Sequence, residues 1–245
     1  MDVSEADLKA LIDDKYDGST ENRHLLRQDM ARLTSGEPLA YVIGWIPFLG
    51  LRIHLDSKPL IPRPETEWWA EELAAHLAGR SSVSVLDLCA GSGAIGCSIL
   101  KFHPDANVSF AELDAKHKET IEKNLRENDL PDAKIGIGDL FAPFPGERFD
   151  VIASNPPYIP SGRKLEHSVT GFEPEEALFA GEDGLSVIRR IAAEAPMHMH
   201  EGGELWLECD AEHAEEAKAL VSEHAKRAEL RNDQYGRPRL IVGYY

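Results

Sequence analysis

Short apolar runs and longer segments with helical spacing alternate from residue 82 to the end of the chain. The apolar runs are typical of buried strands, and the segments between them have the hydrophobic period of a helix face. Expected strands cover residues 82–88, 107–112, 133–139, 148–154, 203–209 and 239–245. Four helices are expected among these strands. One begins near Gly93, the next ends near Asn128, the third covers residues 185–195 and the fourth extends from Asp210 to Leu230. This alternation predicts an α/β fold in which a mostly parallel sheet lies between two layers of helices.

The N-terminal part of the chain follows a different pattern and predicts two smaller units. Apolar residues at helical spacing indicate a short amphipathic helix around residues 25–33 and a weaker one around residues 8–12. The next segment is aromatic and β-branched with glycine and proline between, which indicates a hairpin-like connection. We therefore expect a short helical cap over residues 1–36, a connector over 37–61 and a larger domain over 62–245.

A well-marked helix is expected at the start of the large domain, between Ile61 and Gly79. Pro64 suits the first turn of a helix, where its missing N–H leaves no hydrogen bond unmade, and Gly79 suits the turn that ends it. We expect Trp68 and Trp69 on this helix to pack against the sheet or the cap, without a chemical role.

The first strand of the large domain runs into the glycine-rich sequence DLCAGSGAIG, where a helix is expected to begin. Gly91, Gly93 and Gly96 match the Gly-x-Gly-x-x-Gly pattern, in which the backbone approaches a dinucleotide at a helix N-terminus. Glu112 ends the next strand, where a carboxylate can accept hydrogen bonds from both hydroxyls of a ribose. These residues predict a nucleoside cofactor without specifying which one. A close-packed turn without ligand and a solvated strand end are the alternatives.

The sequence SNPPYI ends the strand over residues 148–154 with a rigid polar corner. Two consecutive prolines can continue neither a helix nor a central strand. In a doubly wound sheet this corner and the glycine loop border the same crevice, where ligands bind. The segment from Ser161 to Asp183 is long and irregular, and it is a candidate substrate loop. For an Asn-Pro pair alone, a turn with a packed tyrosine is the simpler interpretation.

The polar corner suits methyl transfer to a planar nitrogen better than hydride transfer. An amide or aromatic amino nitrogen is a weak nucleophile because its lone pair is delocalised, so a site must hold it in line with the methyl group. The side-chain oxygen of Asn155 and the carbonyl of Pro156 can each accept a hydrogen bond from one N–H of the substrate nitrogen. Tyr158 can pack on the flat face of the substrate group. Because a sulfonium is already a strong electrophile, no dedicated general base is required.

Composition and charge narrow the class of protein and of partner. The chain has 245 residues, 42% of them hydrophobic, which is enough for one large core with a small appendage. Its net charge of −17 disfavours extended contact with DNA or RNA and fits a neutral or basic protein partner better. With no apolar run long enough for a membrane span and an acidic N-terminus unlike a signal peptide, a cytoplasmic protein is expected. The three cysteines, like His198 and His200, lack the spacing of a metal site, so no metal is expected.

Five motifs occur along the chain in the order LIPRPETE, VLDLCAGSGAIG, GDLF, SNPPYI and FEPEEAL. In these motifs the chain resembles the HemK/PrmC family, S-adenosylmethionine-dependent protein-glutamine N5-methyltransferases that modify the Gly-Gly-Gln motif of peptide chain release factors. The resemblance extends from about Glu37 to the C-terminus. It implies a class I, Rossmann-like methyltransferase fold, S-adenosylmethionine as cofactor and a release factor as protein substrate.

The resemblance also implies roles for individual residues. Those implied to bind the cofactor are Cys89, Ala90, Gly91, Ser92 and Gly93 at its methionine part, Glu112 at its ribose, Asp139 and Leu140 at its adenine, and Asn155. Those implied to hold the substrate glutamine are Asn155, Pro156, Pro157 and Tyr158. The family's conserved rim is matched by Arg63, Glu65, Phe172 and Glu173. For Arg63 and Glu65, a structural salt bridge or a helix cap is an equally good explanation.

Two features depart from the family's pattern. Cys89 and Ala90 stand where the family commonly has Gly-Thr, a change that a loop acting through its backbone should tolerate. The helical region before residue 37 is only about half as long as is typical of the family, so we expect the release factor to dock more weakly or differently. The alternatives are a ribosomal-protein glutamine methyltransferase, an enzyme acting on adenine or guanine amino groups in nucleic acid, and a non-catalytic binding module with the same fold.

Overall fold

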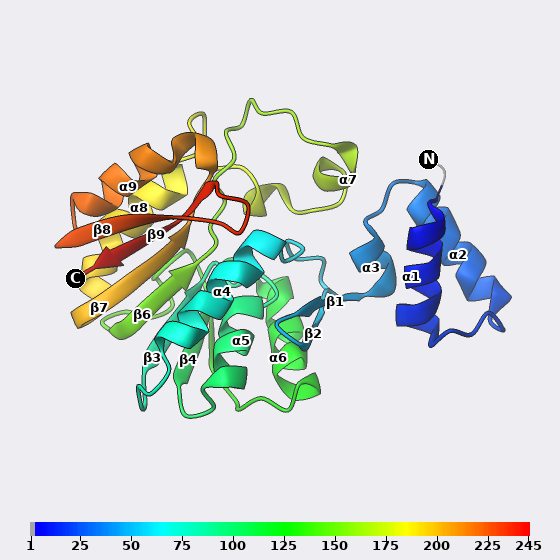
Figure 1. Cartoon of the computed structure of the whole chain (residues 1–245), viewed down its shortest axis with the longest axis horizontal. Helices are drawn as coiled ribbons and strands as arrows, with labels where there is room; N and C mark the ends of the chain where they lie inside the picture. The colour runs from blue at the N-terminus through cyan, green and yellow to red at the C-terminus, as the bar shows by residue number, and fades with distance from the viewer. Residues whose placement is uncertain (1–2) are drawn as a thin grey trace.

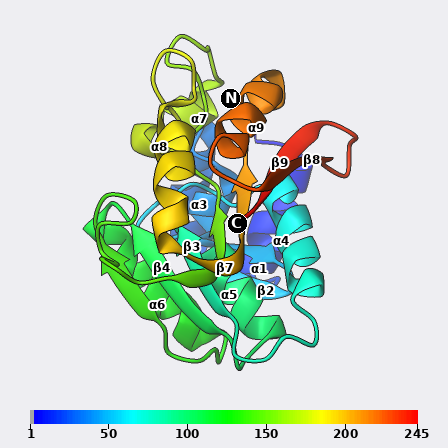
Figure 2. The ribbon, with the colours of Figure 1, turned by 90° about the vertical axis from the view of Figure 1, so that its left-hand side faces the viewer.

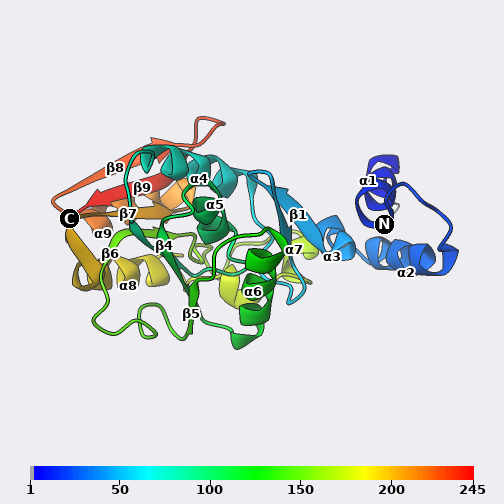
Figure 3. The ribbon, with the colours of Figure 1, turned by 90° about the horizontal axis from the view of Figure 1, so that it is seen from below.

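The computed structural model describes residues 3–245. Its first two helices stand apart from the rest of the molecule and are joined to it by a third, short helix and a hairpin (Figure 1). Figure 3 shows the same separation from below. These elements are α1 (Glu5–Tyr16), α2 (Arg23–Thr34), α3 (Leu39–Ile43), β1 (Trp45–Phe48) and β2 (Leu51–His54). Strands β1 and β2 pair antiparallel and form a separate two-stranded sheet.

The other strands form one seven-stranded sheet in the order β5-β4-β3-β6-β7-β9-β8. They are β3 (Ser84–Leu88), β4 (Asn107–Glu112), β5 (Lys134–Ile137), β6 (Phe149–Ser154), β7 (Met199–Glu208), β8 (Arg227–Asn232) and β9 (Pro238–Tyr244). The five strands from β5 to β7 run parallel, whereas β9 runs antiparallel to both β7 and β8. The prediction of a mostly parallel sheet is confirmed.

Helices cover both faces of this sheet, and Figure 2 shows α4 and α8 on opposite sides of the strands. One face carries α4 (Pro64–His76), α5 (Ala94–Phe102) and α6 (Lys118–Glu127), and the other carries α8 (Ser186–Glu194) and α9 (Ala214–Ser222). Consecutive residues of β3 serve the two layers: Val85 packs in the core beneath α4 and Leu86 in the core beneath α8. Within residues 3–245, no helix is long and apolar enough to cross a membrane.

The remaining helical elements are short. They are α7 (His167–Thr170) and the 3₁₀ turns Ala115–His117, Glu175–Ala177, Ala195–His198 and Ala211–His213. Helix α7 and the second of these turns lie in the segment from Ser161 to Asp183, which is otherwise irregular. The segment is fixed at one point by a parallel bridge between Ile159 and Phe179.

The single long helix expected from Asp210 to Leu230 is wrong. Helix α9 ends at Ser222, and residues 227–232 form β8, which pairs antiparallel with β9. The alternate residues Ala228 and Leu230 pack against the same core as α9, so the strand period applies to this segment. Tertiary pairing with β9 outweighs the helix propensity of a sequence rich in alanine, glutamate and lysine.

The order of the strands reverses between β3 and β6, which are neighbours in the sheet although they are far apart in the chain. Leu88 at the end of β3 is in register with Ser154 at the end of β6. The next residues, Cys89 and Asn155, therefore leave the sheet side by side at its carboxyl edge. This switch point is where open α/β sheets bind their ligands.

Helix α3 is shared between two hydrophobic cores. Val42 packs with Leu11 and Leu33 in the small core of the cap, whereas the adjacent Tyr41 belongs to the core of the large domain. The Tyr41 hydroxyl donates a 2.6 Å hydrogen bond to the carbonyl of Pro59, beyond the hairpin. The cap is thus joined to the large domain through one short helix whose successive side chains point to different cores.

Candidate active site

A cavity of about 280 Å³ opens at the carboxyl ends of β3, β4 and β6. Of the residues expected to bind the cofactor, those in its wall are Cys89, Gly91, Glu112, Asp139, Leu140 and Asn155. Pro157, expected at the substrate, also lines it. Ala90, Ser92 and Gly93 are buried in the loop behind this wall. The structure therefore gathers residues from four separate stretches of sequence around one cavity.

The three glycines of the loop serve two different purposes. Gly91 and Gly93 have φ values of 55° and 77°, a left-handed conformation that favours glycine, and Gly93 is the N-cap of α5. Gly96 is different, because a Cβ there would lie 2.3 Å from Cε1 of Phe110 on β4. It allows α5 to pack closely against the sheet. Cys89 also has positive φ, at 62°, although it carries a side chain.

Glu112 is tied to the glycine loop and almost fully buried. Its Oε2 accepts a 2.7 Å hydrogen bond from the backbone N–H of Gly91, and its Oε1 accepts one of 2.9 Å from Asp114. The carboxylate lines the cavity and can accept further hydrogen bonds there, since each carboxylate oxygen can accept two. Burial raises the pKa of Glu112, and the backbone donors oppose that shift. The residue is thus placed to accept two hydroxyl groups.

The carboxylate of Asp139 is not free at the cavity wall. It is held by both terminal nitrogens of Arg190 on α8, at 3.1 and 2.7 Å. Arg190 lines the same cavity, although it was not anticipated from the sequence. Leu140 beside it is buried and offers an apolar surface to a flat ring. This end of the cavity therefore combines an apolar wall with an ion pair at its rim.

A second, smaller cavity of about 160 Å³ lies on the other side of the Asn-Pro-Pro-Tyr corner. Pro156 and Tyr158 line this cavity together with Arg63. The residues that line both cavities are Leu60, Asn155 and Ala177. Asn155 is the only one of the three with a polar side chain, so its amide stands between the two spaces.

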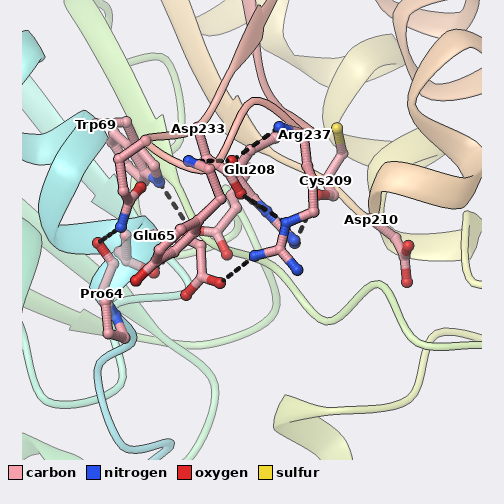
Figure 4. Close-up of polar contacts among 12 residues, drawn as sticks. Pro64, Glu65, Trp69, Glu208, Cys209, Asp210, Asp233 and Arg237 are labelled. Atoms are coloured by element: carbon pink, nitrogen blue, oxygen red, sulfur yellow. Dashed lines mark hydrogen bonds and ion pairs between the residues drawn. The ribbon is translucent and has the colours of Figure 1, made fainter.

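A buried carboxylate supports this corner from behind, and the sequence analysis did not identify it. Glu208, at the end of β7, is fully buried and accepts hydrogen bonds from three side chains. The donors are the Thr66 hydroxyl and the Trp69 indole, both 2.7 Å from Oε2, and the Tyr158 hydroxyl, 2.9 Å from Oε1. Figure 4 shows the contact between Trp69 and Glu208. Trp69, expected only to pack, therefore also has a polar function. The only signal in the sequence was a second acidic residue, after Glu204, in the apolar run over residues 203–209.

The four rim residues prove to be structural partners. Arg63 donates to the buried Glu173 at 2.6 Å, and Glu173 also accepts from the backbone N–H of Ile61. Glu65 forms an ion pair with Arg237, as shown in Figure 4. The fourth rim residue, Phe172, packs against the core beneath α4. The first of these contacts ties the irregular loop to the segment that leads into α4, next to the smaller cavity.

One buried asparagine connects the hairpin to the glycine loop. The Asn124 amide on α6 accepts a hydrogen bond from the backbone N–H of His54 and donates to the His54 carbonyl, as a neighbouring strand would. It also donates to the carbonyl of Ser92 at 2.8 Å. Asn128, one turn later, makes the same pair of bonds to Arg52, nearer the solvent. Strand β2 is thereby fastened to α6 and to the loop.

The chain is similar to known methyltransferases. Residues 69–171 match the family model described as "Methyltransferase small domain". The release factor glutamine methyltransferase of Bordetella pertussis is 38% identical, over 89% of this chain and 82% of that protein. The protein of the same name from Streptococcus pneumoniae is 33% identical, over 91% and 80%.

Solved structures show the same fold. A methyltransferase from Pyrococcus furiosus superposes with a TM-score of 0.60 at 19% identity, covering 89% of this chain and 97% of that one. The 16S rRNA N2 G1207 methyltransferase of Thermus thermophilus, solved with AdoMet and guanosine, gives 0.59 at 19% identity, covering 82% and 49%. The fold is that of class I methyltransferases. From the identity to the curated relatives over most of both chains, we conclude that this chain belongs to the release factor glutamine methyltransferase family.

Proposed function

We propose that the chain transfers a methyl group from S-adenosylmethionine to the side-chain amide nitrogen of the glutamine in the Gly-Gly-Gln motif of a release factor. The observation that carries this proposal is the position of Asn155, which lines both the larger and the smaller cavity. A methyl donor bound in the larger cavity and a methyl acceptor bound in the smaller one would meet at this residue. Family membership supports the choice of substrate, and the two adjoining cavities support separate positions for the methyl donor and the methyl acceptor.

The larger cavity fits a nucleoside with an amino-acid arm. The carboxylate of Glu112 lines this cavity and can accept hydrogen bonds from the ribose hydroxyls. Leu140 offers an apolar surface for the adenine, with Asp139 at its edge. Cys89 and Gly91 present the loop to the methionine part. When bound, S-adenosylmethionine supplies a methyl group on a positively charged sulfur.

In the smaller cavity, two fixed oxygen atoms would hold the substrate amide that receives the methyl group. In the proposed arrangement, the Asn155 side-chain oxygen and the Pro156 carbonyl each accept one N–H of the substrate amide. The ring of Pro157 fixes the backbone that follows, so both oxygens keep their separation while the nitrogen attacks. Tyr158 lies along the side of the cavity and packs on the flat face of the amide.

The attacking nitrogen loses its proton only after it has formed the new bond to carbon. Once alkylated, it carries a positive charge and is a strong acid, so either oxygen that holds it can pass the proton on to water. The pKa of Tyr158 is raised well above its usual value by burial, followed by the charge of Glu208, so its hydroxyl stays protonated. Tyr158 therefore acts through its ring and not as a base.

We also propose that residues 1–36 form a docking cap, that residues 37–61 connect it, and that residues 62–245 carry the reaction. The separate core of α1 and α2 supports this division, as does the location of both cavities in the large domain. A protein substrate must reach a recessed cavity with one side chain, and a second contact on the cap would help to hold it.

A methyl-transfer assay with labelled S-adenosylmethionine tests the proposed function. The acceptors are a cognate release factor, the same factor with its Gly-Gly-Gln glutamine changed to alanine, a ribosomal protein fraction and unmethylated DNA and RNA. Label on the release factor that disappears with the glutamine supports the proposal. Label on the ribosomal fraction or on nucleic acid alone would replace the proposed substrate with one of the alternatives. The net charge of −17 favours the protein substrate over nucleic acid.

A further inference from the structure

Asn155 donates to a hydroxyl whose own proton is already committed elsewhere. The Asn155 Nδ2 lies 3.1 Å from the Thr66 Oγ1, and the Thr66 hydroxyl lies 2.7 Å from Oε2 of Glu208. Thr66 and Glu208 are both buried, on α4 and at the end of β7 respectively. Three residues from distant parts of the sequence therefore form one line of hydrogen bonds that ends at the reaction site.

The direction of these hydrogen bonds follows from chemistry. The indole N–H of Trp69 can only donate, and it points to the same Oε2 that the Thr66 hydroxyl approaches. The Tyr158 hydroxyl approaches the other oxygen, and Arg239 donates to Tyr158 and to the carbonyl of Cys209. A carboxylate with three donors around it accepts from all of them. Thr66 consequently gives its single proton to Glu208 and has only lone pairs left for Asn155.

We infer that Thr66 and Glu208 are positioning residues, which fix the side-chain amide of Asn155 with its NH₂ group toward Thr66 and its oxygen toward the reactants. An amide turned by 180° would place its oxygen against the lone pairs of Thr66, which is repulsive. Among residues 3–245, the Asn155 side chain has no other hydrogen-bond partner, so Thr66 alone determines its orientation. This inference rests on the proposed function of Asn155 as an acceptor for the substrate amide.

The same carboxylate also fixes the other side of the acceptor cavity. Through Oε1 it holds the hydroxyl of Tyr158, whose ring lines that cavity. Glu208 thus connects the group that orients the acceptor nitrogen with the group that packs on the acceptor.

Three variants of Thr66 test the inference. Thr66→Val keeps the shape of the side chain but lacks the hydroxyl, and Thr66→Ala lacks both the hydroxyl and the methyl group. Thr66→Ser keeps the hydroxyl and loses only the methyl group. The matched control is Ser84→Ala. Ser84 also donates a 2.7 Å hydrogen bond to a carboxylate, that of Asp150, but at the opposite end of β3. For each protein, kcat, KM for both substrates, cofactor affinity and melting temperature are measured. The side-chain NH₂ signal of Asn155 is followed by ¹⁵N NMR and assigned by its loss in Asn155→Ala.

The expected result is a kcat about tenfold lower in Thr66→Val and Thr66→Ala, which corresponds to one lost hydrogen bond, with cofactor affinity unchanged. Thr66→Ser and Ser84→Ala should keep kcat. The Asn155 NH₂ signal should shift and exchange faster with water in the first two variants only. An unchanged NH₂ signal together with a wild-type kcat in Thr66→Val or Thr66→Ala would overturn the inference. The NMR signal is measured without any reaction. It therefore tests whether Thr66 orients the Asn155 amide even if the release factor proves not to be the substrate.

Discussion

Gly91 and Glu112 are joined by a 2.7 Å hydrogen bond from a backbone N–H to a carboxylate oxygen. The bond links the glycine loop after β3 to the end of β4, and both residues face the larger cavity. The loop and the acidic residue, which the sequence suggests as two separate features, are therefore one structural unit. A change at Glu112 alters the loop as well as the ribose position.

Glu112→Gln should lower cofactor affinity by about tenfold or more above pH 7, because a hydrogen bond to a charged acceptor becomes one to a neutral amide. Burial raises the pKa of Glu112. The wild-type affinity should therefore fall with decreasing pH before an ordinary glutamate would protonate, whereas the variant should show no such fall. Calorimetric titration with S-adenosylhomocysteine across this range measures both. Asp105→Asn, an exposed carboxylate before β4, is the control and should behave as the wild type.

Asn155→Ala should lower kcat by at least about 100-fold, since it removes an oxygen aimed at the reacting group. Cofactor affinity should change little, because Glu112 and the glycine loop are intact. Single-turnover methyl transfer and calorimetry separate these effects. Asn107→Ala, at the exposed start of β4, is the control for loss of an asparagine. Near-normal turnover in Asn155→Ala would contradict the assigned role.

Arg63→Ala should reduce the free energy of unfolding by about 2 kcal/mol, because it leaves the buried carboxylate of Glu173 without its charged partner. The loop held by Glu173 should also become more sensitive to limited proteolysis. Arg189→Ala breaks the ion pair with Asp183 at the far end of that loop, where both side chains are about half exposed. It should cost less than about 1 kcal/mol. Equal losses of stability in urea denaturation would show that the buried pair has no special weight.

Asn124→Ala should reduce the free energy of unfolding by about 3 kcal/mol, since three hydrogen bonds of a fully buried amide are lost. It should also weaken cofactor binding, because one of the bonds holds the Ser92 carbonyl in the glycine loop. Asn128→Ala, at the C-cap of the same helix, is the matched variant. It removes similar bonds nearer the solvent and should cost about 1 kcal/mol with cofactor binding unchanged. Urea denaturation and calorimetry distinguish the two.

The buried Asp87 should make stability depend on pH. Burial raises its pKa to about 8, and its Oδ1 has no hydrogen-bond partner among residues 3–245. Because the folded-state pKa lies above the unfolded one, the native protein holds a proton that the unfolded chain releases. The contribution to stability is complete below the ordinary pKa of an aspartate and is lost as pH rises through about 8. Melting temperatures of Asp87→Asn should lack this decline, and a parallel decline in both proteins would rule out Asp87 as its source.

The sequence predicts the parallel core well because its inner strands β3 and β6 are buried on both faces and leave strong apolar runs. Residues 107–112 are predicted and found as a strand with the same bounds. The prediction of helix for residues 227–230 is wrong because this strand lies at the edge of the sheet, is half-exposed and is rich in residues that favour helices. At the site, the loop and the corner are visible as motifs. The bonds of Glu208 to Thr66 and Trp69 span about 140 residues of chain, and local patterns carry no information on them.

Helix α3 connects the cap to the region next to both cavities. Its side chain at Val42 is held by the cap, and the neighbouring Tyr41 is bonded to Pro59, next to the Leu60 wall that both cavities share. A shift of the cap relative to the large domain would therefore act one residue away from a wall that both cavities share.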